Sequence, residues 1–589
     1  MENILRFRIT LLLSGVLVTI AAALWAIPTS AQEFSPWLVP QPQSVPPVPV
    51  GAVNLNDVAG CAPVVNSTSP DRNDTHPALS EDGLSLYFAS TRAGGFGAYD
   101  LWVSHRDSLD ACWGPQVNLG QPVNTTAREF APNLSPDGHW LFFHSKRQAR
   151  SCGNGVVQEL WAAHRQDTTN DLGWEQPVNL GCAVNAVKNS TTGVLTDSAG
   201  ANFFDDGSGK LNLYFTRNVF PGDQQGFHIY LSTCSSDITT CNTQGLWDQG
   251  TPVSALNSLF RDTRTTIRHD GLEMILSSAR PGSLASENLW VSTRATTQNQ
   301  NWSTPEPINC DAMPGCSPWN PEGPLVNSNN FDGGPALSWD GTELYFFVSS
   351  PALANTTGCT EGSAQESPNS VPACRDLYVT KRKYITNTVL SSGTNPSVFG
   401  QSVTFTATVS SAAESTPTGT VTFQDGATSL GSGTVASGQA TFTTSSLTIG
   451  SHSITGQYRG DRISKESSGS LTQNVEYGVC PLYDQTRSVH SGATFPIKLQ
   501  LCDANGNDLS SPAIVVHAMS VTAVSGYSGT ADAPGNANQD NDFRFDPTLG
   551  STGGYIFNLS TRGLAPGTYS LEFIAGSDPI THSVNFGVN

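Results

Sequence analysis

A short phrase that recurs along the first two-thirds of the chain constrains its fold more than any other feature. The phrase centres on an Asp-Gly pair, and a run of Leu with Tyr or Phe follows it in most copies. The aspartates of these pairs are Asp82, Asp137, Asp206, Asp270 and Asp340. Because a repeat of this kind marks one supersecondary unit that has been copied, it predicts a repeat architecture.

Each copy carries signals for four short strands. The first ends at the Asp-Gly turn, and the second is the aromatic run, such as residues 84–90. The third is an Asp-Leu-Trp phrase such as residues 100–104, and the fourth begins at a Trp, as in residues 113–119. Four strands per unit, repeated radially, are typical of a β-propeller blade. Five copies therefore predict an all-β chain that starts with a five-bladed β-propeller over residues 50–384.

The fifth copy lacks a fourth strand after Arg382. A matching piece lies at the other end of the chain, where Val53-Asn54-Leu55 resembles Val178-Asn179-Leu180 of the second copy. We expect this N-terminal segment to complete the last blade. Ring closure of that kind would remove the exposed sheet edges that an open array leaves.

The repeated Ser-x-Asp-Gly and Asp-Leu-Trp/Tyr phrases resemble the TolB-type, WD-repeat-like family of propeller repeats, over roughly residues 50–384. The third copy departs from the pattern, with extra residues around Gly207-Ser208-Gly209. The resemblance implies a periplasmic or secreted propeller. It also implies binding of proteins or ligands more often than catalysis.

Two further β domains are expected after the propeller. Residues 385–476 alternate between apolar and polar positions with Gly turns, which is typical of an immunoglobulin-type sandwich. The phrase GTVTFQDG and Tyr458-Arg459-Gly460-Asp461 resemble the bacterial Ig-like repeat domains of surface and adhesion proteins. Residues 477–589 contain four further strand signals and predict a second β-sandwich.

The N-terminus indicates export. Arg6 and Arg8 precede an apolar run, and Thr29-Ser30-Ala31 offers a cleavage site, so residues 1–31 are expected to be a signal peptide. An uncleaved membrane anchor is the alternative, since the apolar run is long. Residues 32–49 are rich in Pro and predict an extended linker. We therefore expect a periplasmic, cell-surface or extracellular protein, without membrane insertion once the signal is cleaved.

Twelve cysteines fit an oxidising compartment. Most fall into pairs of sequence neighbours, which are the candidate disulfides: Cys234 with Cys241, Cys310 with Cys316, Cys359 with Cys374, and Cys480 with Cys502. Cys61, Cys112, Cys152 and Cys182 remain without an assigned partner. Because no Cys-x-x-Cys pair occurs, zinc is not expected.

A repeated acid and a repeated arginine are the candidate binding residues. The acids lie eight residues before the Asp of each turn, at Asp74, Glu129, Asp262 and Asp332. The arginines lie ten residues after it, at Arg92, Arg147 and Arg280. Both positions should fall on the face opposite the Asp-Gly turns, near the central channel. They would either fasten each blade internally or line a polar funnel for a ligand.

No catalytic motif is present, and no cofactor is expected. The Asp-rich stretch from Asn536 to Asp546 could bind calcium, but a polar loop is the preferred interpretation. The net charge of −20 argues against a nucleic-acid partner. The sequence thus favours a non-catalytic exported protein that binds a protein, peptide or glycan, with the sandwiches as stalk or adhesion modules. A carbohydrate hydrolase or lyase with its site in the funnel, and a structural surface spacer, are the alternatives.

Overall fold

The computed structural model describes residues 73–589 apart from gaps at 149–150, 154–156, 186, 189–192, 194, 219–225, 284–286, 309–325, 328–330, 351–373, 414, 524–527 and 531–537. The expected signal peptide, Pro-rich linker and closing segment 50–66 lie outside the described residues. So do Cys61, Cys310, Cys316, Cys359 and the side chain of Cys374.

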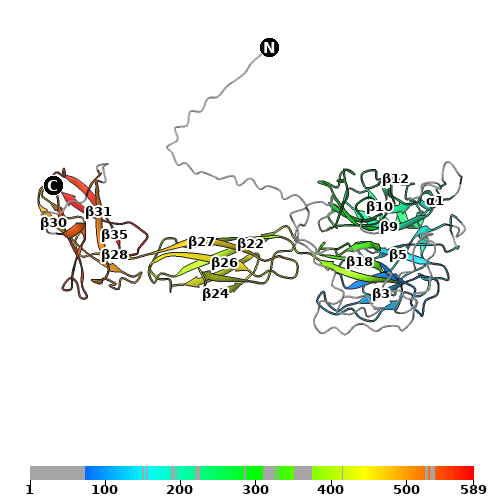
Figure 1. The fold of residues 1–589 in the computed structure, drawn as a ribbon, viewed down its shortest axis with the longest axis horizontal. Helices are drawn as coiled ribbons and strands as arrows, with labels where there is room; N and C mark the ends of the chain where they lie inside the picture. Colours follow the sequence, from blue (N-terminus) through cyan, green and yellow to red (C-terminus); the bar gives the residue numbers. More distant parts are fainter. Residues whose placement is uncertain are drawn as a thin grey trace, which may run out of the picture.

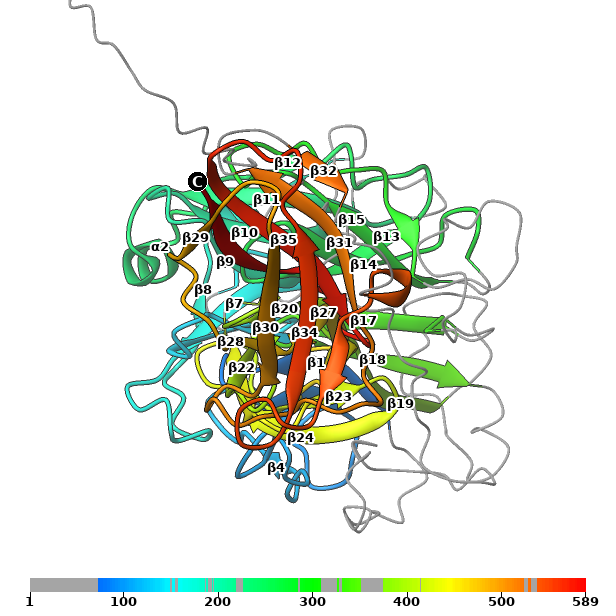
Figure 2. The ribbon, with the colours of Figure 1, turned by 90° about the vertical axis from the view of Figure 1, so that its left-hand side faces the viewer.

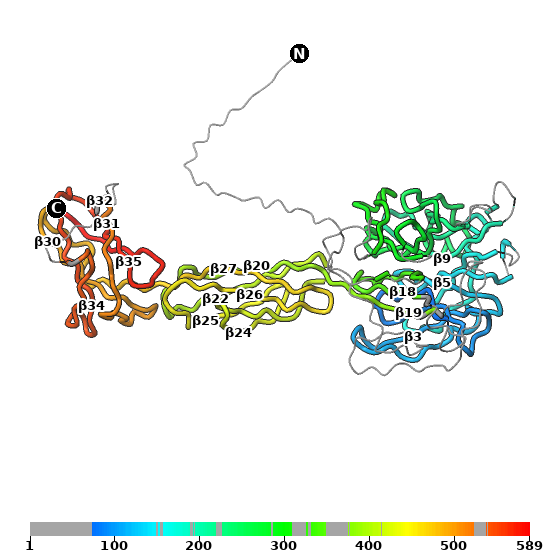
Figure 3. Tube along the Cα trace, viewed as in Figure 1, coloured from blue at the N-terminus to red at the C-terminus, as the bar shows by residue number. Residues whose placement is uncertain are grey.

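The described residues are all-β with short helical turns, and they form three bodies in a row (Figure 1). The first body holds the repeats, and the tube in Figure 3 continues from it through the middle body to the C-terminus. Seen from the left-hand side of Figure 1, the C-terminal body lies in front of the repeat body (Figure 2). No helix among the described residues is long and apolar enough to cross a membrane.

The repeat body contains five antiparallel sheets, each built from consecutive strands. The first strands are β1 (Asp74–Leu79), β5 (Glu129–Leu134), β9 (Ser198–Asp205), β13 (Asp262–Ile267) and β17 (Phe331–Leu337). The second strands are β2 (Ser85–Ser90), β6 (Trp140–Ser145), β10 (Leu211–Arg217), β14 (Glu273–Ser278) and β18 (Glu343–Ser350). The third strands are β3 (Asp100–His105), β7 (Glu159–His164), β11 (His228–Cys234), β15 (Asn288–Thr293) and β19 (Cys374–Lys381).

Four of the five sheets have a short fourth strand. These strands are β4 (Val117–Asn118), β8 (Val178–Asn179), β12 (Thr251–Pro252) and β16 (Glu306–Pro307). The fifth sheet has three described strands. Two short helices, α1 (Cys182–Asn185) and α2 (Ile238–Gln244), accompany the second and third sheets.

The sheets form a closed ring around their first strands. Each first strand contacts the first strand of the next sheet, and β17 contacts β1. A separate apolar core fills each space between neighbouring sheets, including the space between the fifth and the first. The arrangement is therefore propeller-like, with the first strands at its axis.

The second strands are buried on both faces because each sheet is packed between two others. Leu86 and Phe88 join the core shared with the fifth sheet, whereas Tyr87 and Ala89 join the core shared with the second. Both faces being buried explains why these runs are continuously apolar. The repeated Asp-Gly pairs form the turns between first and second strands, as predicted. At the first turn, the Asp82 carboxylate accepts hydrogen bonds from Ser80 Oγ (2.6 Å) and the Leu84 N–H (2.9 Å).

The middle body is a two-sheet sandwich around Phe405, Val421, Ile454 and Tyr458. One sheet contains β20 (Thr386–Ser392), β22 (Val403–Ser411) and β25 (Gln439–Thr444). The other contains, in spatial order, β21 (Ser397–Val398), β27 (Ser467–Glu476), β26 (Gly450–Tyr458), β23 (Thr420–Asp425) and β24 (Thr428–Thr434).

The C-terminal body is a second two-sheet sandwich with a continuous apolar core. Its first sheet is β28 (Gly478–Pro481), β30 (Thr494–Cys502), β34 (Gly554–Ser560) and β33 (Arg544–Asp546). Its second is β29 (Ser488–Val489), β36 (His582–Val588), β35 (Gly567–Ala575), β31 (Val516–Ala523) and β32 (Ser528–Thr530).

Candidate functional site

The repeated acids are fully buried and are held inside the repeat body. Asp74, Glu129 and Asp262 each begin a first strand and have 0% exposure. Each faces the repeated arginine of its own sheet, at 2.6 Å for Asp74–Arg92, 3.3 Å for Glu129–Arg147 and 2.6 Å for Asp262–Arg280. The fourth acid, Asp332, accepts a hydrogen bond from Asn288 of the preceding sheet (2.9 Å). The predicted residues thus come together as internal pairs.

The repeated arginines also stack on the aromatic residue of the third strand. The distance from the guanidinium carbon to the ring centroid is 5.3 Å for Arg92 and Trp102, and 5.2 Å for Arg147 and Trp161. This contact explains why a Trp or Tyr recurs in the third-strand phrase. Burial lowers the pKa of Arg147.

The third sheet shows what happens where the acid is missing. Ser198 stands opposite Arg217 in the strand register, where other sheets carry the repeated acid. Arg217 donates to the carbonyl oxygens of Val184 (2.7 Å) and Gln249 (2.8 Å). Burial lowers the pKa of Arg217 to about 10, although the Asp248 carboxylate opposes this shift.

A second set of repeated arginines escaped the sequence analysis. Each follows the third strand, and its Nε donates to the carbonyl oxygen of the Gly in the Asp-Gly turn. The pairs are Arg106–Gly83 (2.8 Å), Arg165–Gly138 (2.8 Å), Arg294–Gly271 (2.6 Å) and Arg382–Gly341 (2.8 Å). The available signal was an arginine six residues after the start of each third-strand phrase. These arginines fix the turns on the face opposite the repeated acids.

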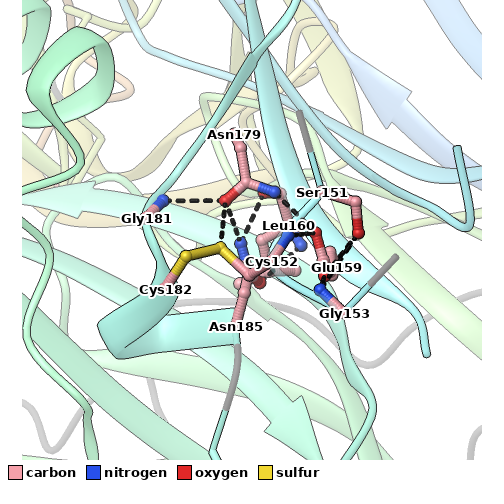
Figure 4. The surroundings of a disulfide bond; sticks show 9 residues. All are labelled: Ser151, Cys152, Gly153, Glu159, Leu160, Asn179, Gly181, Cys182 and Asn185. Carbon is pink, nitrogen blue, oxygen red and sulfur yellow. Dashed lines mark hydrogen bonds between the residues drawn. A yellow bond between two sulfur atoms is a disulfide. The ribbon is translucent and has the colours of Figure 1, made fainter. Parts of the chain in front are cut away.

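The second sheet is further secured by a disulfide between Cys152 and Cys182, two cysteines to which the sequence analysis gave no partner (Figure 4). Beside it, the buried carboxylate of Glu159 accepts hydrogen bonds from Ser151 Oγ (2.7 Å) and Asn179 Nδ2 (2.6 Å). Disulfides also join Cys234 to Cys241 and Cys480 to Cys502, two of the four expected pairs.

A cavity of about 250 Å³ opens on the face where the first strands begin. We call it the mouth cavity. The described part of its lining comes from the second, third and fourth sheets and combines four cationic side chains with polar groups, one carboxylate and Phe227. The cations are Arg128, Lys146, Arg261 and Arg264, and the carboxylate is Asp197. The repeated acids and arginines do not belong to this lining.

Gln158 carries an acceptor that nothing else among the described residues satisfies. Its side-chain oxygen, Oε1, is buried and has no hydrogen-bond partner within the described part of the chain. Its backbone N–H donates to the Asp197 carboxylate (2.6 Å). Because a buried acceptor without a donor costs free energy, Gln158 is suited to a ligand that brings a hydroxyl or N–H into the mouth cavity.

Below the mouth cavity lies a smaller space of about 30 Å³ on the axis of the ring. It is bordered by one equivalent residue of each first strand, and each of these residues has a positive φ. They are His76 (53°), Ala131 (49°), Gly200 (60°), Arg264 (48°) and Gly334 (61°). Each sits at a bulge in the pairing of the first and second strands. Arg264 borders both spaces.

The ring of Phe130 contacts two arginines and two histidines. The guanidinium carbons of Arg128 and Arg264 lie 4.1 Å and 5.4 Å from its ring centroid. The rings of His76 and His144 lie 4.3 Å and 5.4 Å from it. His144 Nδ1 accepts the Gly200 N–H (3.2 Å), so this histidine links the second and third sheets.

Metal binding finds no support in the described residues. They hold no group of three or more His, Cys, Asp or Glu side chains placed to hold an ion. In the stretch proposed as a calcium loop, Asp542 faces His517 (2.8 Å) and Asp546 accepts from Thr548 Oγ1 (2.7 Å).

Comparison with known proteins gives one family match. Residues 390–476 match the bacterial Ig-like domain (group 3). No curated protein matches the sequence. The Ig-like domain and the disulfides indicate an extracytoplasmic protein. The TolB-type resemblance stays a prediction.

Several solved structures are similar to the chain. The α-L-arabinofuranosidase PaAbf62A from Podospora anserina, in complex with cellotriose, is 11% identical, with 60% of this chain and 98% of that chain covered and a TM-score of 0.33. An endo-arabinase from Bacteroides thetaiotaomicron is 13% identical, with 58% and 97% covered and a TM-score of 0.31. A GH43_1 enzyme from Xanthomonas citri, complexed with xylotriose, is 15% identical, with 55% and 90% covered and a TM-score of 0.32.

These similar structures are enzymes, and they contradict our expectation that the protein is not one. That expectation rested on the lack of a catalytic motif and on the TolB-type resemblance. At these identities and TM-scores, the likeness transfers none of those enzymes' site residues to this chain. The chemistry of the site therefore depends on the residues that line the mouth cavity.

Proposed function

We propose that the protein is an exported, carbohydrate-active protein whose five-bladed propeller takes a saccharide into the mouth cavity. The observation that carries this proposal is the polar cavity with the buried Gln158 oxygen, which has no hydrogen-bond partner among the described residues. Saccharides present many hydroxyl donors and acceptors around small apolar patches. The mouth cavity offers the matching groups, with Thr216 and Asn218 as polar partners and Phe227 as an apolar wall.

The size of the mouth cavity limits the length of the saccharide that it can hold. Its volume of about 250 Å³ is just below the roughly 300–1,000 Å³ of most small-molecule sites. We therefore propose that it takes one end or one short segment of a saccharide. The Ig-like domain and the C-terminal sandwich, proposed at residues 385–476 and 477–589, would hold the propeller away from its point of attachment.

Binding and turnover can be measured together on a panel of defined oligosaccharides. Calorimetry reports binding, and chromatography of the same mixtures reports products. We expect Gln158→Ala to weaken binding of the best saccharide about tenfold, because the buried acceptor is lost. Gln148→Ala is the matched control, since Gln148 is exposed and lies outside the cavity lining. A panel in which no saccharide binds or is cleaved would contradict the proposal.

A variant of Asp197 can distinguish saccharide binding from catalysis. Asp197 is the carboxylate among the described lining residues, and glycoside cleavage canonically uses a pair of carboxylates, of which Asp197 would supply one. Asp197→Asn keeps an oxygen that can accept the Gln158 N–H. If Asp197 serves the reaction, this variant binds the saccharide but releases no product. Equal loss of binding and turnover would show that Asp197 only shapes the cavity.

A further inference from the structure

The loop between β2 and β3 of the first sheet presents an aromatic ring on the same face as the mouth cavity. β2 ends at Ser90 and β3 begins at Asp100, and both residues lie level with the start of the first strand. Phe96, in the middle of this loop, is 47% exposed. The corresponding loop of the third sheet supplies Phe227 to the lining of the mouth cavity. Because binding sites are rich in aromatic side chains, an exposed ring on this face is available to a ligand.

A buried carboxylate fixes the backbone of this loop. Asp100 accepts hydrogen bonds from the Phe96 N–H and the Gly97 N–H (3.2 Å). Asn118 Nδ2 donates to the same carboxylate (3.2 Å). Gly95 packs so closely on the carboxylate that a side chain at this position would collide with it. Because the backbone is already held, the Phe96 ring loses little conformational freedom when it binds a ligand.

The same loop packs directly against a wall of the mouth cavity. Gly97 lies so close to the Ala127 carbonyl oxygen that a side chain at this position would collide with it. Ala127 directly precedes Arg128, which lines the mouth cavity. The Arg128 guanidinium carbon lies 4.9 Å from the ring centroid of Tyr99, the last residue of the loop. These contacts place Phe96 at the rim of the mouth cavity.

We propose that Phe96 forms a second saccharide subsite, where its ring packs against the apolar C–H face of a sugar unit that extends beyond the mouth cavity. This inference rests on the proposed function, since it extends the same site. A cavity of about 250 Å³ takes one short segment, so further units of a longer saccharide pass over its rim. The negative face of an aromatic ring attracts the polarised C–H groups of a sugar. The ligand class is therefore a saccharide longer than the cavity.

The test measures binding to the full chain by calorimetry. The probes are ladders of xylo-, cello- and arabino-oligosaccharides with two to six units. We expect affinity to rise with length in the parent protein until the rim is occupied. Phe96→Ala should weaken the longest bound members about tenfold, because the ring contact is lost, and should leave the shortest unchanged. Phe96→Tyr keeps an aromatic ring and should bind all members as the parent does.

Leu172→Ala is the matched control. Leu172 is 48% exposed, close to the value for Phe96, but it lies between β7 and β8 on the face of the Asp-Gly turns. This variant should bind every member as the parent does. Parent affinity that is independent of length would overturn this inference alone, and so would equal weakening of short and long members, or of none, by Phe96→Ala. A parent protein that binds no member of the ladders would overturn the proposed function with it.

Discussion

At the scale of single residues, the repeated acid is an internal anchor for an arginine. The carboxylate of Asp74 is buried and lies 2.6 Å from Arg92, and Ser90 Oγ accepts from the same guanidinium (3.0 Å). A buried ion pair of this kind adds little by itself, because desolvation of both charges opposes their attraction. Its effect appears when one partner is removed, since the other charge then stays buried and unpaired.

Arg92→Ala should therefore destabilise the repeat body by about 3–5 kcal/mol. Arg217→Ala is the matched control, because Arg217 faces no repeated acid and its loss strands only carbonyl acceptors, at a cost of about 1–3 kcal/mol. Urea unfolding followed by tryptophan fluorescence measures both. Equal losses for the two variants would contradict the unpaired-charge explanation. Saccharide binding by folded Arg92→Ala protein should be unchanged, since Arg92 does not line the mouth cavity.

Arg264, which lines the mouth cavity, differs from the equivalent residues of the other sheets. Arg264 corresponds to His76, Ala131, Gly200 and Gly334, so no shared pattern announces it. Counting along the repeat finds residues that several sheets share, and in three sheets these form internal acid–arginine pairs. The acid–arginine pairs were thus predictable from sequence. The cavity was not, because its lining includes residues that differ from their equivalents in the other copies and come together only in the folded ring.

At the scale of elements, a repeated asparagine takes the place of a longer fourth strand. The side chain of Asn124 accepts the Leu101 N–H (2.8 Å) and donates to the Leu101 carbonyl (2.9 Å), as a neighbouring strand would. Asn185, Asn257 and Asn327 make the same pair of bonds to Leu160, Ile229 and Leu289. The two-residue fourth strands therefore suffice, because the asparagine satisfies the third strand beyond them.

Asn124→Ala should leave the buried Leu101 N–H without a partner, whereas the Leu101 carbonyl still accepts from the Leu119 N–H (3.0 Å). The expected cost is about 1–3 kcal/mol, and the Leu101 amide should exchange with solvent faster than in the parent protein. Hydrogen-exchange mass spectrometry of the β3 peptide and a thermal melt measure the two effects. Asn301→Ala, in an exposed loop, is the control and should change neither. Unchanged protection of β3 from hydrogen exchange would show that the Asn124 hydrogen bonds are dispensable.

The strands and turns were the most predictable elements. Asp-Gly turns and aromatic runs fixed the first two strands of each sheet, because local turn chemistry and burial decide them. The aromatic runs do not alternate between apolar and polar positions, since each sheet is buried on both faces. The repeated asparagines and the second arginine set bind residues more than twenty positions away, so local patterns could not reveal their hydrogen-bond partners.

At the scale of the whole molecule, ring closure brings the two ends of the repeat region together. Asn73, directly before β1, pairs with Arg375 of β19, and the Arg375 N–H donates to Asn73 Oδ1 (3.2 Å). The predicted role of residues 50–66 lies outside the described residues and stays a prediction. Asn73 itself lies beside β19, the last described strand of the fifth sheet.

The joint between the ring and the Ig-like domain uses the last Asp-Gly turn. Asp340 receives hydrogen bonds from Ser338 (2.6 Å) within the turn and from Arg462 of the Ig-like domain (2.7 Å). The Tyr384 hydroxyl donates to the Asp340 carbonyl (2.9 Å). Burial disfavours the charged form of Asp340, but the hydrogen bonds outweigh it and hold the pKa of Asp340 below its usual range.

This pKa makes the joint sensitive to acid. Because the folded-state pKa of Asp340 lies below the unfolded value of about 3.9, its stabilisation is complete above that value and is lost as the pH falls through the folded pKa. Arg462→Ala removes the contact between domains and leaves the turn intact. We expect this variant to lose about 0–1 kcal/mol at neutral pH, with the difference from the parent shrinking below about pH 4. Urea unfolding between pH 3 and 7 measures that difference, and a loss that grows on acidification would refute the assignment.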